Sequence, residues 1–137
     1  VKNGGSLDTK TNKIKIEANV NNDGTVNAKD IEGDVLNNGI LTADNIYGNN
    51  ELTCEADHCA CSSEGVKNHK VSVLNNNELT VKGTVVGDMC NWNKATVKTV
   101  EGALRNMGTM TVNNAPSFSN KQSGTLTFAG STDGIAQ

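Results

Sequence analysis

The residues best able to do chemistry lie close together in one stretch of the sequence. Residues 54–61 hold three of the four cysteines, an acidic pair and a histidine, and His69 and Cys90 follow downstream. Thiolate and imidazole groups at this density could bind zinc, which takes four nitrogen or sulfur ligands in structural sites. The spacing does not give the two separated ligand pairs of a standard zinc site. We therefore predict disulfides here, and no metal or other cofactor.

The four cysteines are even in number, which suits an oxidising compartment and predicts an extracellular location. The disulfide candidates are Cys54, Cys59, Cys61 and Cys90. Three connectivities are possible, and pairing of Cys59 with Cys61 is the least comfortable. We favour a bond from Cys90 that holds the cysteine-rich stretch against a later part of the fold.

Catalysis has little support in the sequence. His58 and His69 are the only histidines, and neither lies in a recognised nucleophile–base frame. The aspartates Asp44, Asp57 and Asp88 occur in turn contexts, where capping is their ordinary role. We therefore predict a protein that is not an enzyme.

A repeat of about 15 residues organises the rest of the chain. Residues 22–31 and 37–46 share the pattern Asn-x-Gly-x-apolar-x-Ala-x-x-Ile, and the pentapeptide Asn-Asn-Glu-Leu-Thr occurs at both 49–53 and 76–80. Related copies follow at 106–112 and 123–128, with fainter ones at 3–7 and 93–97. Asn and Gly both favour turns, and fixed-period repeats indicate a solenoid.

Side chains alternate across a strand, so each copy predicts which residues enter the core. We expect the apolar positions inside and their polar neighbours outside. The inward set is Val26, Ala28, Leu41, Ala43, Leu52, Leu79, Val81, Met110, Val112, Leu126 and Phe128, and the outward set is Thr25, Asn27, Thr42, Thr80, Thr109, Thr111, Thr125 and Thr127. The chain contains 21 asparagines, and those at equivalent turns should stack as side-chain ladders. A β-sandwich with Asn-rich turns is the alternative fold.

Composition argues against nucleic-acid binding and against a membrane-spanning segment. The net charge is −3 with scattered lysines, which does not predict a nucleic-acid interface. No run of about 20 apolar residues could span a bilayer. We expect residues 1–137 to form one solenoid domain, with a cysteine-rich insertion at about 54–69.

The Asn-x-Gly-x-Leu-x-Ala pattern, clearest over residues 20–48, resembles the repeats of filamentous haemagglutinin-like exoproteins and related autotransporter-type adhesins. This resemblance implies a right-handed parallel β-helix on a bacterial surface, used for adhesion or display. Its partners would be proteins or glycans of a host or neighbouring cell. The alternative is a structural subunit that binds copies of itself end to end in an extracellular fibre.

Two sets of residues could contact a ligand in such a protein. Trp92 could stack on a sugar ring, although a half-buried packing role is the more usual one for a lone tryptophan. The pairs Thr109/Thr111 and Thr125/Thr127 form outward Thr-x-Thr motifs, which suggest an ice-binding array, but two copies are few and β-propensity alone explains outward threonines.

Overall fold

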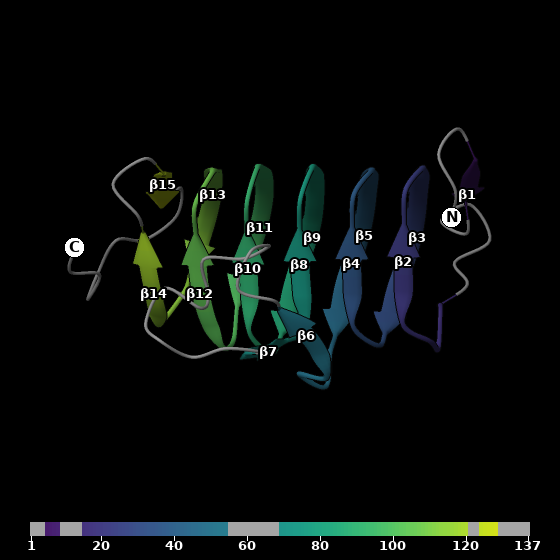
Figure 1. Cartoon of the computed structure of the whole chain (residues 1–137), viewed down its shortest axis with the longest axis horizontal. Coiled ribbons are helices and arrows are strands. Elements are labelled where there is room, and N and C mark those ends of the chain that lie inside the picture. The colour runs from purple at the N-terminus through teal and green to yellow at the C-terminus, as the bar shows by residue number, and fades with distance from the viewer. Residues whose placement is uncertain (1–4, 9–14, 55–68, 121–123, 129–137) are drawn as a thin grey trace.

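A computed structural model describes residues 5–8, 15–54, 69–120 and 124–128. In this part of the chain every regular element is a β-strand. The strands stack side by side along one axis, as Figure 1 shows, with each coil of chain contributing one short and one long strand. No helix in the described ranges is long and apolar enough to cross a membrane.

Two parallel sheets form the walls of the solenoid. The short-strand sheet has the order β14-β12-β10-β8-β4-β2, and the long-strand sheet has the order β1-β3-β5-β9-β11-β13-β15. The short strands are β2 (Val20–Asn22), β4 (Val35–Asn37), β8 (Val73–Asn75), β10 (Met89–Asn91), β12 (Ala103–Asn106) and β14 (Ser117–Asn120). The long-sheet strands are β1 (Ser6–Asp8), β3 (Thr25–Glu32), β5 (Ile40–Tyr47), β9 (Glu78–Val86), β11 (Lys94–Val100), β13 (Thr109–Asn114) and β15 (Thr125–Phe128).

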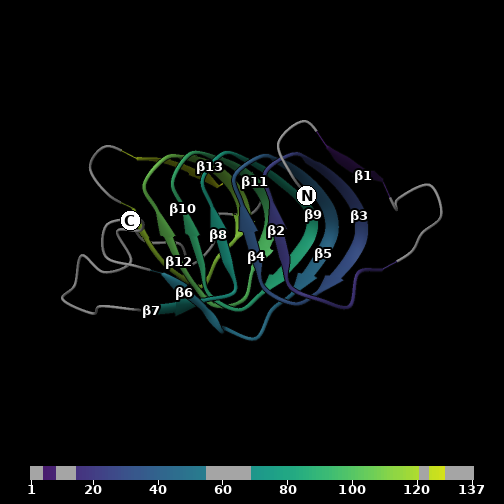
Figure 2. The ribbon, with the colours of Figure 1, turned by 45° about the vertical axis from the view of Figure 1, so that its right-hand side comes forward.

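This arrangement confirms the predicted β-solenoid, and the β-sandwich alternative is wrong. Neighbouring coils pair in parallel and in register, for example Val26 with Leu41 and Ala28 with Ala43. An ordinary β-sandwich with Asn-rich turns would pair its strands antiparallel. Figure 2 shows the two sheets as facing walls of one tube.

The core is one apolar column between the two walls. Each coil adds inward residues from its short and long strands, such as Val35 and Leu41, which are 0% and 1% exposed. The predicted inward residues of the inner coils are buried as expected: Val26, Ala28, Leu41, Ala43, Leu79, Val81, Met110 and Val112. Leu126 and Phe128 point to the same column but are half-buried, because their strand ends the long sheet.

One predicted repeat copy is wrong. Leu52 belongs to β6 (Leu52–Cys54), which pairs antiparallel with β7 (His69–Val71) outside the solenoid. It is half-buried there and is not a core residue of a coil. The identical pentapeptide at 76–80 enters β9 because Val73, Leu74 and Asn75 precede it as a short strand, whereas no such strand precedes residue 49.

The chain leaves the solenoid at Gly48 and returns at Ser72. The next coil then stacks directly on the previous one, with Val35 paired to Val73 and Asn37 to Asn75. Residues 55–68, which contain Cys59, Cys61 and His58, lie outside the described residues. The β6–β7 pair is thus the visible base of the predicted cysteine-rich insertion.

Candidate functional site

The Asn-rich turn of each coil contains a ladder of buried side-chain amides. Nδ2 of Asn22 donates to Oδ1 of Asn37 at 2.9 Å, and the same bond joins Asn37 to Asn75, Asn75 to Asn91 and Asn91 to Asn106, each at 2.8 Å. All five side chains are fully buried. The predicted stacking of asparagines is confirmed, at the last residue of the five short strands β2, β4, β8, β10 and β12.

Each ladder amide also satisfies the backbone of the turn. Nδ2 of Asn75 donates to the carbonyls of Asn77 and Lys94, while its Oδ1 accepts the Asn77 N–H. Buried polar groups carry a penalty unless they are hydrogen-bonded. The ladder is therefore a structural device that leaves this corner of the interior closed to a ligand.

Outside the turn, a second and exposed row repeats the pattern. Asn38 donates to Asp23 at 3.0 Å, and Asn76 donates to Asn38 at 2.7 Å. Asn93 donates to Asn77 at 3.3 Å one residue further along. A shallow hollow of about 440 Å³ lies over this corner, lined by residues of β1, β3 and β5, by the turns before them and by Asn77 in the turn before β9.

The outward face of the long sheet carries a threonine row longer than the sequence suggested. Thr111 pairs in register with Thr127, and Thr109 with Thr125, so the two predicted Thr-x-Thr motifs are neighbours. The first of these rows continues without interruption through three further coils, at Thr96, Thr80 and Thr42. The second row is broken by Lys94, Glu78 and Ile40.

The corner opposite the asparagine ladder anchors the β6–β7 pair. Asp34, which is 3% exposed, accepts the N–H of Asn49 at 2.7 Å and of Glu51 at 2.8 Å on its two carboxylate oxygens. Ser72 accepts the N–H of Asn50 and donates its hydroxyl to Oδ1 of the same residue. Asn50 has a φ of 55°, a left-handed conformation that asparagine tolerates. Sequence reasoning missed Asp34, although it immediately precedes a short strand.

The β6–β7 pair covers an apolar cluster on the outer face of the short-strand sheet. Val71, Leu74 and Cys90 are buried in this cluster, and Leu36, Leu52 and Trp92 pack against it. Cys90 is 0% exposed beneath the pair, and Cys54 of β6 pairs in backbone register with His69 of β7. The structure thus brings Cys90 to the same side of the molecule as β6, and the disulfides stay a prediction.

Trp92 is half-buried against this cluster. Its Nε1 is buried and has no acceptor among the described residues. Its position therefore fits the packing role at least as well as an open sugar-stacking platform.

A groove of about 230 Å³ runs beside β6. Its lining comes from β2, from β4 and from β6 with the residues just before it: Asn19, Val20, Asn21, Asp34, Leu36, Glu51, Leu52 and Thr53. Two half-buried apolar side chains, Leu36 and Leu52, lie among polar ones, whereas Val20 is in register with Val35 and packs against the core. Among the described residues, no group of three or more His, Cys, Asp or Glu side chains could hold a metal ion.

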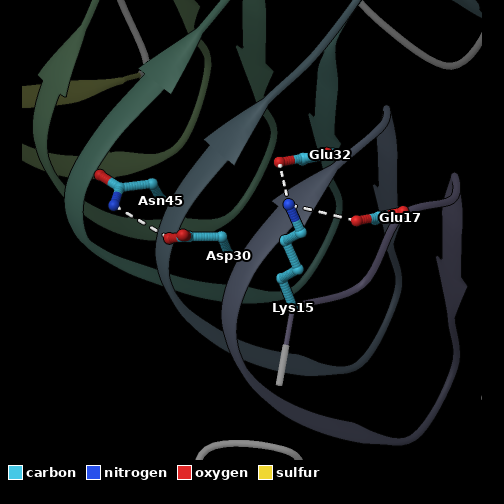
Figure 3. Close-up of polar contacts among 5 residues, drawn as sticks. All are labelled: Lys15, Glu17, Asp30, Glu32 and Asn45. Atoms are coloured by element: carbon cyan, nitrogen blue, oxygen red, sulfur yellow. Dashed lines mark hydrogen bonds and ion pairs between the residues drawn. The ribbon is translucent and has the colours of Figure 1, made fainter. Parts of the chain in front are cut away.

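A small ionic cluster lies at the first coil. Lys15 forms ion pairs with Glu17 at 3.1 Å and Glu32 at 3.2 Å, as Figure 3 shows, with Asn45 donating to Asp30 nearby. The hydrogen bond to Glu17, and then that to Glu32, raises the pKa of Lys15 above its usual value. All three side chains are about half exposed, so these pairs add little stability.

No protein-family model matches the sequence, and neither the characterised proteins nor the solved structures compared with it gave a match. The resemblance to filamentous haemagglutinin-like repeats therefore stays a prediction from the motif.

Proposed function

We propose that this chain is a non-enzymatic module of an extracellular surface, an adhesin or display rod that binds a protein or glycan of another cell. The observation that carries the proposal is that the interior is regular and closed, whereas the irregular features lie on the exterior. The interior is an apolar column closed by buried amides. The irregular features, which are the β6–β7 pair and the groove beside it, are all added on the outside.

The insertion supports the proposal because the stacking of the short strands continues across it. In the short-strand sheet the coils on either side of it stack in the same register as the two coils before it, and in the long-strand sheet the pairing of β5 with β9 shifts between Ala43 and Ile46. A scaffold that continues its stacking across an inserted element is suited to presenting that element, since loops on a rigid framework commonly carry recognition. The even number of cysteines suits the oxidising environment in which such a module would work.

Cell adhesion by coated beads tests the proposal. Beads carrying the folded chain should adhere to cultured epithelial cells or to bacterial cells, and beads carrying the Leu79→Asp variant should not. That substitution places a charge in the core, where Leu79 is 1% exposed. Equal adhesion of both bead types would show that the folded surface is not what binds.

A self-assembling fibre subunit is the second candidate. In the described part of the chain, β2 and β14 of one sheet and β1 and β15 of the other each have one edge without a strand partner. Leu7 of β1 is 40% exposed at one such end. Unpaired edges of this kind can pair with another copy. Negative-stain electron microscopy of the purified chain should show long uniform fibres if this candidate is correct, and short rods if it is not.

A further inference from the structure

The outer face of the short-strand sheet carries an apolar row that the β6–β7 pair covers only in part. Leu36, Leu74 and Cys90 occupy the same position in three successive coils, paired in register. Leu74 and Cys90 are 3% and 0% exposed beneath the pair, whereas Leu36 is only half-buried. The β6–β7 pair thus covers two residues of this row and leaves Leu36, in the coil before them, partly uncovered.

The strand next to the uncovered residue has an open edge. β6 and β7 form a two-stranded sheet, so in the described structure one edge of β6 has no strand partner. In Figures 1 and 2, β7 lies on the side of β6 toward the C-terminal coils. The groove lies on the opposite side, between β6 and the strands β2 and β4. The free backbone groups of β6 therefore border a groove that contains Leu36.

We propose that this groove accepts an extended peptide segment of a partner protein, which adds as a third strand beside β6. The added strand would bond to the open edge of β6 and place an apolar side chain over Leu36, as β6 and β7 already cover Leu74 and Cys90. Strand addition of this kind draws affinity from main-chain hydrogen bonds and specificity from pockets for alternate side chains. The inference rests on the proposed function, because it names the kind of partner that the displayed surface binds.

The groove also defines the sequence of its occupant. Leu36 and Leu52, the apolar side chains of the groove, call for apolar residues at alternate positions, because side chains of a strand alternate between its faces. Glu51 at the rim is exposed and forms no ion pair with a described residue, which favours a lysine or arginine in the partner strand.

The anchor at the base of β6 holds this edge in place. Both carboxylate oxygens of Asp34 accept N–H groups from the segment that leads into β6. A strand fixed at its start loses little freedom when a partner adds to it, which lowers the cost of binding.

Fluorescence anisotropy with a labelled peptide tests the inference on the whole chain. The probe alternates valine with threonine and carries one central lysine. We expect saturable binding that Leu36→Asp weakens by roughly tenfold or more, because a charge replaces the apolar contact. Glu51→Lys should weaken binding by about threefold to fivefold, as expected for one exposed charge pair. The matched control is Glu78→Lys, the same charge change on the outward face of the long sheet, and it should bind like the parent.

A second probe separates strand addition from simple apolar or charge attraction. The same peptide N-methylated at alternate residues keeps its side chains but loses the backbone donors of one edge. Two methylated peptides are made, one with methyl groups on the odd-numbered residues and one with methyl groups on the even-numbered residues. The peptide whose methyl groups lie on the edge toward β6 should lose binding, and the other should keep it. Equal binding of both methylated forms, or no effect of Leu36→Asp, overturns the inference. If the peptide fails to bind while coated beads still adhere to cells, the inference fails and the proposed function stands.

Discussion

Nδ2 of Asn37 donates to Oδ1 of Asn75 at 2.8 Å, although 38 residues separate the two. The equivalent bond from Asn22 to Asn37 spans 15 residues. The insertion therefore adds 23 residues without changing the stacking of the amides. The ladder is continuous across the longest interruption of the repeat in the described part of the chain.

Asn75→Ala should strongly destabilise the fold. The substitution removes the partner of Asn37, and it leaves the carbonyls of Asn77 and Lys94 without their side-chain donor. We expect the free energy of unfolding to fall by about 2–4 kcal/mol. Urea unfolding followed by circular dichroism measures it. Asn38→Ala, in the exposed row, is the control and should cost less than about 1 kcal/mol. Similar losses in both variants would show that burial of the ladder adds nothing.

Deletion of residues 49–71 should leave a folded solenoid. Joining Gly48 to Ser72 restores the 15-residue spacing between the neighbouring asparagines, and a β carbon built on Gly48 would contact Ser72. The shortened chain should unfold cooperatively, with lower stability because Leu74 and Cys90 lose their cover. Its single tryptophan, Trp92, should shift its emission to longer wavelength. A chain without cooperative unfolding would show that the insertion is part of the core.

Gly39→Ala should destabilise the turn between β4 and β5. A β carbon at this position meets the carbonyl oxygen of Gly24 in the preceding coil, which is backbone and cannot rotate away. We expect a loss of about 1–3 kcal/mol, the usual cost of overpacking. Thermal unfolding gives the comparison with Thr42→Ala, an outward change in the same coil. If both variants melt together with the parent, the coils are free to separate at this turn.

Trp92→Phe should keep the stability of the parent, whereas Trp92→Ala should lose about 2–4 kcal/mol. The ring packs against the cluster that contains Cys90, and phenylalanine keeps much of that contact. It also removes an indole N–H that has no acceptor in the described structure. Guanidinium unfolding of the three proteins distinguishes these effects. A large loss of stability in Trp92→Phe would show that Nε1 donates a stabilising hydrogen bond.

The sequence predicted the coils well because their physics is local. Alternation in 25–28 and 40–43 is enough to place Val26, Ala28, Leu41 and Ala43 in the core. The Asn-rich turns likewise predicted that amides would stack, since equivalent residues of successive coils must meet.

The repeat motif alone did not identify which copies form coils. Asn-Asn-Glu-Leu-Thr occurs in β9 and again at the start of β6, and the motif cannot tell the two apart. The distinguishing signal lies upstream, in an apolar residue followed two positions later by the buried asparagine. Val35 with Asn37 and Val73 with Asn75 follow this rule, whereas the equivalent positions before the copy at 49–53 are Ile46 and Gly48, which lack the asparagine.

The groove and the full threonine row could not be predicted from the sequence, for a different reason. The groove joins Asn21, Leu36 and Leu52 from three strands, and the position of β6 against β4 depends on contacts that no periodicity encodes. The threonine row was underestimated because its copies at Thr42, Thr80 and Thr96 have different neighbours two residues earlier. Register across coils, and not the local motif, unites them.

The asparagine ladder also gives the rod an electrical direction. From Asn22 to Asn106 each amide donates toward the following coil, so their dipoles all point the same way along the axis. A β-sheet by itself has only a small net dipole. The aligned amides should add one, with its positive end toward the C-terminal coils. The electrostatic potential should therefore differ between the two ends of the stack, and an approaching charged molecule would be attracted to one end more than to the other.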